Sequence, residues 1–261
     1  MSPDILATEL FMLIEQAILD QPRSQQRRIG PSELGVPCDR RVGYRIAGIE
    51  PAAHRGAAWK PWVGTAMHEQ VATVIASHEV SRMQSQAYQE RYRVEERVSV
   101  GEVDGIEITG SCDLFDVQHG AVWDWKFVTR NKIREQYRPH GPGEQYRVQA
   151  HLYGRGWQRQ GHDVRSVGVI FMTRDGDLAD RHVWHEPYDE QVAIDALDRA
   201  SGIAIAIEAL GPQFTLPTLQ TAEAHCRFCP WFRDGATDIA QACPGHPQQR
   251  NNATIAQLIG A

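Results

Sequence analysis

Four stretches of the chain carry apolar residues at the three- and four-residue spacing of an amphipathic helix. Thr65 is well suited to open the second stretch, and Gly161 and Gly211 end the third and the fourth. The spacing therefore predicts helices over residues 5–19, 65–80, 144–160 and 189–210.

A different pattern, with alternating or continuous apolar residues rich in Val, Ile, Trp and Phe, is typical of strands. Asp104-Gly105 favours a tight hairpin turn between the first two strands, and His119-Gly120 provides the next turn. Short turns of this kind join antiparallel neighbours, so the first three strands are predicted to form a meander. The predicted strands cover residues 92–100, 106–117, 121–128 and 164–172, and residues 181–185 are expected to pair beside the last of them.

The order of these elements is helix, three strands, helix, strand, with helical additions on both sides, which predicts an α/β core. A loop rich in Pro, Ala and Gly is expected at residues 50–61. After Pro217 the sequence has little periodicity, so the segment that follows is expected to be held by metal ligands more than by a core of its own. We divide the chain into an N-terminal helix with a basic connector, a core domain, a C-terminal cysteine segment and a tail, which are residues 1–30, 31–215, 216–247 and 248–261.

Composition narrows the class of protein. Of the 261 residues, 42% are hydrophobic and 23% are charged, which excludes a disordered chain, a collagen and a coiled coil. No apolar run approaches the length that spans a bilayer, and the first residues lack the pattern of a signal peptide, so we expect a cytoplasmic protein without membrane contacts. The net charge of −6 means that any nucleic-acid binding must depend on local basic patches.

Two carboxylates and an ammonium are predicted to converge in the meander. Asp113 lies on the second strand, and Asp124 and Lys126 lie two residues apart on the third, so the last two share one face of the sheet. The short turn between the strands brings Asp113 beside Asp124. Hard divalent cations such as Mg²⁺ and Mn²⁺ prefer carboxylate oxygens, and a lysine nearby can act on a metal-activated water. The alternative is a surface Asp–Lys pair, which is common on strands.

Three further side chains are candidates for the same site. His68 shares a helix face with Val71 and Ile75, so it points toward the sheet as a metal ligand or as a structural core residue. Gln149 and Tyr153 lie one turn apart on the helix after the strands, where they could contact a nucleotide or Lys126, although such pairs are also ordinary helix residues.

Five cysteines occur, and an odd count in a cytoplasmic chain argues against a disulfide framework. The spacing of Cys226 and Cys229 indicates redox chemistry or a metal site. Cys112 adjoins Asp113 on a strand and is expected to act as a small buried hydrophobic residue.

These motifs together resemble the PD-(D/E)XK nuclease superfamily, and more narrowly its RecB-like exonuclease branch, which includes CRISPR-associated iron–sulfur nucleases. The resemblance runs from about residue 32 to 243 and implies an α-β-β-β-α-β core of the restriction-endonuclease type. Asp124 stands where many relatives carry Glu. The motifs that carry the resemblance are Gly64-x-x-x-His68, Gly110-Ser111-Cys112-Asp113, Asp124-Trp125-Lys126 and Gln149-x-x-x-Tyr153.

The resemblance also implies a role for the cysteines, because relatives in this branch join one N-terminal cysteine to three C-terminal ones. Here the set would be Cys38, Cys226, Cys229 and Cys243, holding a 4Fe–4S cluster that clasps the two ends of the chain together. Cys243 lies farther from Cys229 than the last two cysteines of relatives lie from each other. Zinc is the alternative, with His225 or His246 replacing Cys243 as the fourth ligand.

DNA contacts are expected from two basic groups. Aromatic residues near them, Tyr44, Trp59 and Trp62, stack on bases or, in the other interpretation, pack around the cluster. The residues assigned to DNA binding are Arg40, Arg41, Tyr44, Arg130, Lys132 and Arg134.

The resemblance implies a DNA exonuclease that needs Mg²⁺ or Mn²⁺ and degrades single strands from the 5′ end. His68, Asp113, Asp124 and the Trp125 carbonyl would bind the ion, Lys126 would act on the water, and Gln149 and Tyr153 would position the substrate. A structure-specific endonuclease and a non-catalytic DNA-end-binding protein with a zinc site are the alternatives. Partners in recombination and repair, in phage or in CRISPR adaptation would fit the resemblance.

Overall fold

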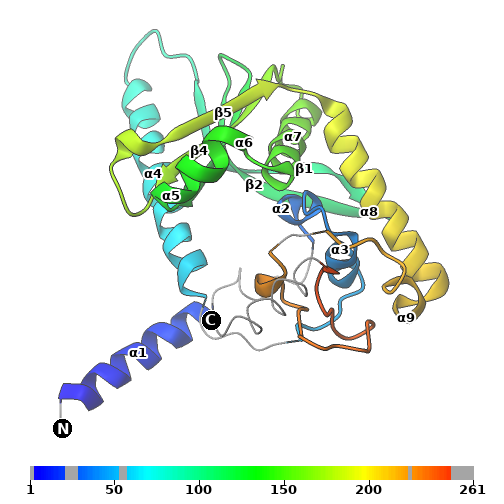
Figure 1. The fold of residues 1–261 in the computed structure, drawn as a ribbon. Coiled ribbons are helices and arrows are strands. Elements are labelled where there is room, and N and C mark those ends of the chain that lie inside the picture. Colours follow the sequence, from blue (N-terminus) through cyan, green and yellow to red (C-terminus); the bar gives the residue numbers. More distant parts are fainter. Residues whose placement is uncertain (1–2, 21–28, 53–57, 223–224, 248–261) are drawn as a thin grey trace.

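The computed structural model describes residues 3–20, 29–52, 58–222 and 225–247. Its centre is one five-stranded sheet in which the strands lie in sequence order (Figure 1). The first three strands form the predicted antiparallel meander, the fourth runs parallel to the third, and the fifth is antiparallel to the fourth. The strands are β1 (Tyr92–Val103), β2 (Ile106–Asp116), β3 (Ala121–Val128), β4 (Ser166–Thr173) and β5 (His182–Pro187).

The helices complete the predicted α-β-β-β-α-β core, with α4 before the meander and α7 in the crossover between the parallel strands β3 and β4. The longer helices are α1 (Pro3–Leu19), α4 (Trp59–Arg82), α7 (Glu144–Arg159) and α8 (Glu190–Leu210). The shorter ones are α2 (Pro31–Leu34), α3 (Asp39–Ile46), α5 (Arg130–Lys132), the π-helix η1 (Ile133–Tyr137), α6 (Arg138–His140), η2 (Leu178–Asp180), α9 (Pro212–Thr215) and η3 (Cys226–Phe228).

The structure corrects the predicted start of one helix and adds a helical segment for which the sequence analysis made no prediction. α4 begins at Trp59 and not at Thr65, because Pro61 falls in the first turn, where a missing N–H costs no helical hydrogen bond. The expected loop at residues 50–61 is therefore shorter, and its residues 53–57 lie outside the described residues. The helical segment from α5 to α6 was not predicted, since its short pieces carry no extended apolar period.

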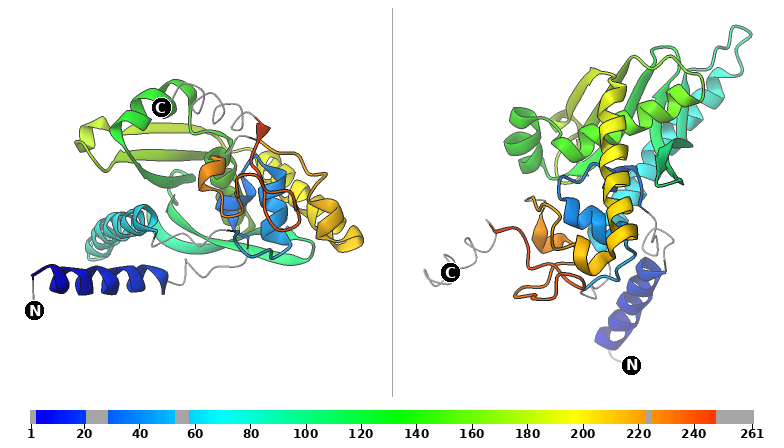
Figure 2. Two further views of the ribbon diagram at one scale, coloured as in Figure 1. Left: turned by 60° about the horizontal axis from the view of Figure 1, so that its bottom comes forward. Right: turned by 90° about the vertical axis from the view of Figure 1, so that its right-hand side faces the viewer.

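Helices cover both faces of the sheet. Phe115 of β2 stacks on Trp157 of α7 at 4.6 Å between ring centroids, so α7 lies on the face that Phe115 occupies. Its neighbour Leu114 points to the opposite face, where it lines a groove with Val74 and Ile75 of α4. α8 runs along the same side as α7 and contacts both α7 and β1 (Figures 1 and 2).

The β1–β2 hairpin contains a bulge that changes its register. The predicted turn is present, with Asp104 at φ 51° and Gly105 at φ 71°, as a type I′ turn requires. The register then shifts between Ser99 and Gly101. Gly101 has φ 144°, and a Cβ there would lie 2.6 Å from a methyl group of Leu197 on α8. Glycine therefore allows both the bulge and the close approach of α8.

The segments from the two ends of the chain pack against each other below the sheet, where α2 and α3 meet the chain after α9 (Figures 1 and 2). A second small core lies between them, with Tyr44 and Trp231 stacked at 5.5 Å. The cysteine segment thus has an apolar core in addition to any ligands it holds, which corrects the expectation of a segment without one. The buried members of this core are Tyr44, Leu216, Cys229, Trp231 and Cys243.

Among the described helices, none combines the length and apolar character that crossing a bilayer requires. The predicted tail at 248–261 and most of the basic connector lie outside the described residues.

We expect Gly101→Ala to lower the free energy of unfolding by at least about 2 kcal/mol, because it combines a strained φ with overlap against Leu197. Urea unfolding of the purified variant measures this. Gly202→Ala is the matched control: Gly202 is in the interior of α8, and a Cβ added there would meet no neighbouring atom within 4 Å. Its substitution should raise stability by about 0.5–1 kcal/mol, and equal effects of both variants would contradict the account.

Candidate active site

The candidate site lies where β2 and β3 separate. The two strands pair from Asp116 with Ala121 to Leu114 with Trp123, and in this register Asp113 and Asp124 form the next pair outward. At that point the backbone hydrogen bonds between the strands end. The Trp125 amide donates instead to Oδ2 of the Asp113 carboxylate, at 2.7 Å. Both carboxylates are therefore located at the fork between the strands.

Asp124 is the more deeply buried of the two carboxylates, at 2% exposure. Its Oδ1 accepts a hydrogen bond from Gln149 Nε2 at 3.0 Å, and Lys126 Nζ lies 2.5 Å from its Oδ2. Burial, helped by the nearby Asp113, raises the pKa of Asp124 to about 6 against the lowering effect of Lys126. A cation close to this carboxylate would favour its charged form.

His68 and an unpredicted acid, Glu95, complete a group around Asp113. His68 Nδ1 lies 3.2 Å from Asp113 Oδ1. One ligand atom from each of His68, Glu95 and Asp113 falls within 4.8 Å of the other two. Asp124 is outside this compact group. The structure therefore brings the predicted metal ligands together in part: Asp113 lies in the group with His68 and Glu95, and it also lies opposite Asp124 across the fork. Trp125 contributes its amide to Asp113.

Glu95 was missed because its position depends on the bulge. The hairpin turn alone sets the register of Val103 with Ile106, which would put Glu96 opposite Asp113. The bulge at Gly101 shifts the register by one residue and brings Glu95 there. Glu95 has φ 53°, an unusual value for a residue with a side chain, and such strain gathers at functional sites.

The helix α7 contributes Gln149 and Tyr153, one turn apart, as predicted for a shared face. Gln149 contacts Asp124 and not Lys126, and its Oε1 is buried without a hydrogen-bond partner among the described residues. Tyr153 is 6% exposed, and burial raises the pKa of its phenol well above the usual value. Its ring lies against Gly110 of β2, where an added Cβ would be 3.1 Å from Cε1.

Comparison with family models assigns residues 38–233 to the PD-(D/E)XK nuclease superfamily. The chain belongs to this superfamily. The nuclease assignment agrees with the two carboxylates and the lysine at the fork. No curated protein sequence matches the chain.

A solved structure with a TM-score above 0.5 shares the fold of this nuclease, and two exonuclease structures match it with lower scores. The crystal structure of SSO0001 has a TM-score of 0.51 at 15% identity, covering 85% of this chain and 94% of that one. An alkaline exonuclease from Laribacter hongkongensis gives 0.47 at 12% identity, with 72% and 91% covered. A phage-related exonuclease from Haemophilus somnus gives 0.35 at 13% identity, with 68% and 91% covered.

The donors at the fork fit the divalent ion that nucleases of this superfamily use. Carboxylate oxygens and one imidazole are suitable ligands for Mn²⁺, and carboxylate oxygens for Mg²⁺. Asp124 Oδ2 has no hydrogen-bond donor at normal angles among the described residues besides its ion pair with Lys126. A carboxylate oxygen can accept from more than one partner, so Oδ2 keeps an acceptor position for a metal ion beside its ion pair.

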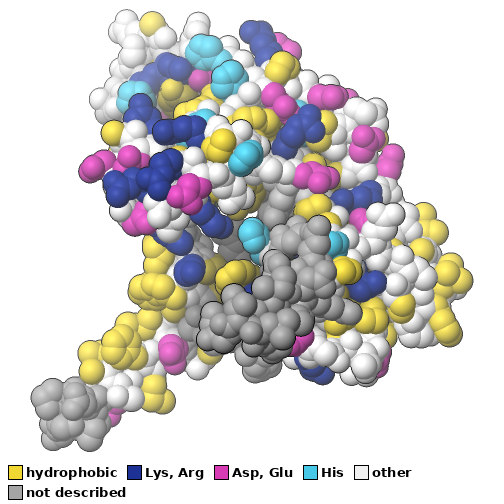
Figure 3. All heavy atoms as spheres, in the orientation of Figure 1, with side chains coloured by type: hydrophobic (Ala, Val, Ile, Leu, Met, Phe, Trp, Pro, Cys, Tyr) yellow, Lys and Arg dark blue, Asp and Glu magenta, His cyan; other side chains and the backbone are white. Residues whose placement is uncertain are grey.

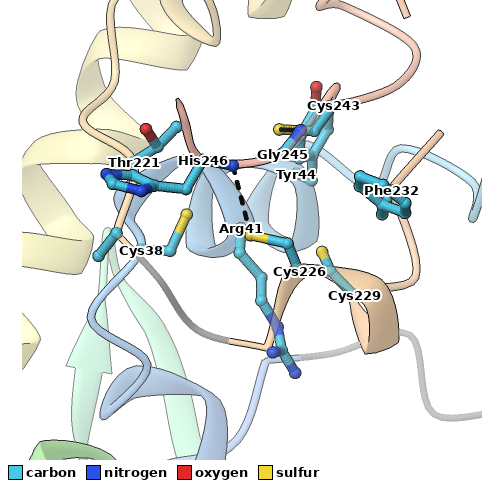
Figure 4. Close-up of a pocket in the computed structure, with 11 residues that line it drawn as sticks. Cys38, Arg41, Tyr44, Thr221, Cys226, Cys229, Phe232, Cys243, Gly245 and His246 are labelled. Carbon is cyan, nitrogen blue, oxygen red and sulfur yellow. Dashed lines mark hydrogen bonds between the residues drawn. The ribbon is translucent and has the colours of Figure 1, made fainter. Parts of the chain in front are cut away.

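All four cysteines of the predicted cluster line one pocket of the nuclease (Figure 4). Each is a buried free thiol. The Gly245 and His246 amides donate hydrogen bonds to the sulfurs of Cys243 and Cys226, both at 3.4 Å. Among the described residues, these sulfurs form no group of three ligand atoms within 4.8 Å. The thiols thus surround a shared space without converging on a single point.

Two predicted DNA-binding residues serve the packing of the chain ends. Tyr44 is fully buried, stacks on Trp231 and donates to the Ile239 carbonyl at 2.5 Å, so the prediction that it contacts DNA was wrong. Arg40 donates to the carbonyls of residues 216, 217 and 219 and approaches the Cys243 sulfur, which leaves little of its guanidinium for phosphate. Arg41 lines the cysteine pocket.

The second basic group is at the surface. Arg130, Lys132 and Arg134 are exposed on α5 and η1, directly after the strand that carries Lys126. Lys and Arg side chains gather on this face, with acidic side chains among them (Figure 3). Arg134 pairs with Glu135 at 2.8 Å. Trp59 precedes His68 by nine residues, which is half a turn out of phase, so it lies on the side of α4 away from the site.

We expect Glu95→Gly to separate stability from metal binding. Without metal, the free energy of unfolding should stay unchanged or rise by up to about 1 kcal/mol, because glycine relieves the positive φ. Mn²⁺ affinity, measured by calorimetry, should fall by roughly tenfold or more with the lost carboxylate.

Asp104→Gly is the control, since Asp104 has φ 51° on the same hairpin but lies at its far turn. This variant should leave Mn²⁺ affinity unchanged. A Glu95→Gly protein that binds Mn²⁺ as tightly as the wild type would remove Glu95 from the site.

Proposed function

We propose that this nuclease is a divalent-metal-dependent DNA exonuclease that also holds a structural 4Fe–4S cluster. The observation that carries the proposal is the convergence of Asp113, Asp124 and Lys126 at the fork between β2 and β3. The resemblance to the RecB-like branch extends it to single strands degraded from the 5′ end.

Mg²⁺ or Mn²⁺ would be held by His68, Asp113, Asp124 and the Trp125 carbonyl, with Glu95 as an additional ligand. When bound, such an ion lowers the pKa of its water and polarises the phosphate. Gln149 keeps Asp124 oriented through their 3.0 Å hydrogen bond. Lys126, at 2.5 Å from Asp124, is the group that orients the attacking water or offsets the charge that develops on the phosphate.

A free DNA end is required in this proposal because the N-terminal segment, which packs beside the catalytic strand, would form a wall along the path of the substrate. Pro31 packs so closely on Gly110, three residues before Asp113, that an added Cβ would lie 2.8 Å from its ring. The Tyr153 ring closes the same spot from α7. A strand that must thread past this wall enters by its end, whereas an open site would accept internal phosphates.

Arg130, Lys132 and Arg134 would hold the phosphates of the incoming strand, and Arg41 remains a candidate near the cysteine pocket. The net charge is −6, so binding by a few local cations should weaken steeply with salt. The exposed position of the three residues on α5 and η1 supports this role.

A 4Fe–4S cluster bound by Cys38, Cys226, Cys229 and Cys243 is supported by the shared pocket and by the two amides that donate to sulfur. Zinc holds its sulfurs at about 2.3 Å and hence within about 4 Å of each other. Among the described residues no three of these sulfurs lie within 4.8 Å of one another, so a zinc ion would require them to draw closer together. Zinc, with His246 or His225 as a ligand, is the alternative.

We expect Asp113→Ala, Asp124→Ala and Lys126→Ala each to lower Mn²⁺-dependent cleavage of end-labelled single-stranded DNA by at least about a thousandfold, since one activated water carries the reaction. Circular dichroism should show an unchanged fold. Asp163→Ala, at an exposed ion pair with Arg165, should cleave like the wild type.

A covalently closed single-stranded circle of the same sequence decides between the two kinds of nuclease. Resistance of the circle supports the exonuclease, and efficient cutting would establish the endonuclease alternative. Binding of ends without any cleavage by the metal-loaded wild type would favour the non-catalytic alternative.

If the four cysteines bind a 4Fe–4S cluster, the purified protein should contain iron, and substitution of one of these cysteines should remove it. Cys226→Ala should give colourless and less stable protein, because the clasp loses a ligand that joins the chain ends. Cys112→Ala, which removes an equally buried thiol outside the pocket, should keep its iron by elemental analysis. One zinc ion and no iron in the anaerobically purified wild type would overturn the cluster and leave the nuclease proposal intact.

A further inference from the structure

An aromatic ring lies against the ammonium of Lys126, which is also paired with Asp124. Lys126 Nζ is 4.9 Å from the centroid of the Tyr146 ring. Tyr146 is on α7, one turn before Gln149. The ammonium thus has two fixed neighbours, the Asp124 carboxylate at 2.5 Å and the face of this ring.

Tyr146 is itself held by a group of rings. Tyr137 stacks on Phe171 of β4, with 4.0 Å between centroids and planes 14° apart, and both rings lie 6.2 Å from Tyr146. Tyr137 is the last residue of the π-helix η1 and is 4% exposed. A π-helix is rare and is often found at functional sites. The irregular turn after β3 therefore supports the ring that contacts Lys126.

A lysine side chain has four rotatable bonds, and an ammonium without a defined neighbour would sample many positions. The Lys126 side chain is 16% exposed, so water competes little with its contacts. A cation over an aromatic ring gains most when it is partly removed from water, and the electron-rich face attracts the charge without accepting a proton. The ring therefore restrains the ammonium and leaves its N–H groups available for a substrate.

We propose that Tyr146 is a positioning residue that fixes the Lys126 ammonium through a cation–π contact. The inference rests on the proposed catalytic role of Lys126 where cleavage is concerned, and its structural part is independent of that role. The electron-rich ring and its position are required, and the hydroxyl group is not.

The test of the ring is a series of substitutions that change its charge distribution but hardly its size. Tyr146→Phe should cleave within about threefold of the wild type, and Tyr146→Leu should lose roughly three- to thirtyfold in kcat with KM little changed. Phenylalanines with one, two and three fluorines at position 146 should lower kcat stepwise, because fluorine withdraws charge from the ring face. A flat series would overturn the proposal.

The same series at Phe115 is the control. This ring is fully buried, whereas Tyr146 is partly buried, and it stacks on Trp157 of the same helix. Any effect of fluorine on packing should therefore be at least as large at Phe115. A stepwise loss of kcat at both positions would mean that fluorine acts through packing and would overturn the proposal.

A double-mutant cycle in metal-free protein separates this inference from the proposed function. Lys126→Met, Tyr146→Leu and their combination are unfolded in urea. The change in the unfolding equilibrium constant of the double variant should differ from the product of the two single-variant changes by roughly three- to thirtyfold. Multiplicative effects would overturn the contact even if the enzyme cleaves DNA. A coupled pair in a protein that cleaves no nucleic acid would instead overturn the function and leave the contact standing.

Discussion

The fork between β2 and β3 is the constraint on which the rest of the active site depends. If the two strands stayed paired, their backbone N–H and C=O groups would hydrogen-bond to each other. Asp113 and Asp124 would then be ordinary neighbours on a sheet. Because the strands part after Leu114 and Trp123, the Trp125 amide needs another acceptor, and the Asp113 carboxylate provides it. One hydrogen bond thus satisfies a buried donor and orients a carboxylate.

The fork also explains why so many groups gather around two acids. Carboxylates at 6% and 2% exposure are costly unless each oxygen has a partner. His68 and the Trp125 amide supply partners to Asp113, while Gln149 and Lys126 supply them to Asp124. These partners come from α4, β3 and α7, so helices on both faces of the sheet contribute side chains to the same site. The same burial that raises the pKa of Asp124 makes a cation there favourable.

The packing of the N-terminal segment with Tyr44 against the C-terminal segment with Trp231 is a second structural unit, separate from the fork. Its small core around Tyr44 and Trp231 and the hydrogen bonds of Arg40 hold the two segments together through the protein's own side chains. The cysteines line a pocket within this packing. A cluster bound there would reinforce an interface that already has apolar contacts. Pro31, in the same N-terminal segment, packs on Gly110 of the catalytic strand.

The sequence by itself determined the α-β-β-β-α-β order, the Asp-Gly hairpin and the convergence of Asp113 and Asp124, because periodicity and turn residues act over a few neighbouring positions. Only the tertiary structure decided which residues join them. The bulge at Gly101, required where α8 presses on β1, shifts the register and brings Glu95 to Asp113 where the turn alone would bring Glu96. The sequence left Tyr44 either to stack on DNA bases or to pack around the cysteines, and its contact with Trp231, far along the chain, shows that it packs. Register and burial of this kind depend on contacts between distant segments, which local patterns do not encode.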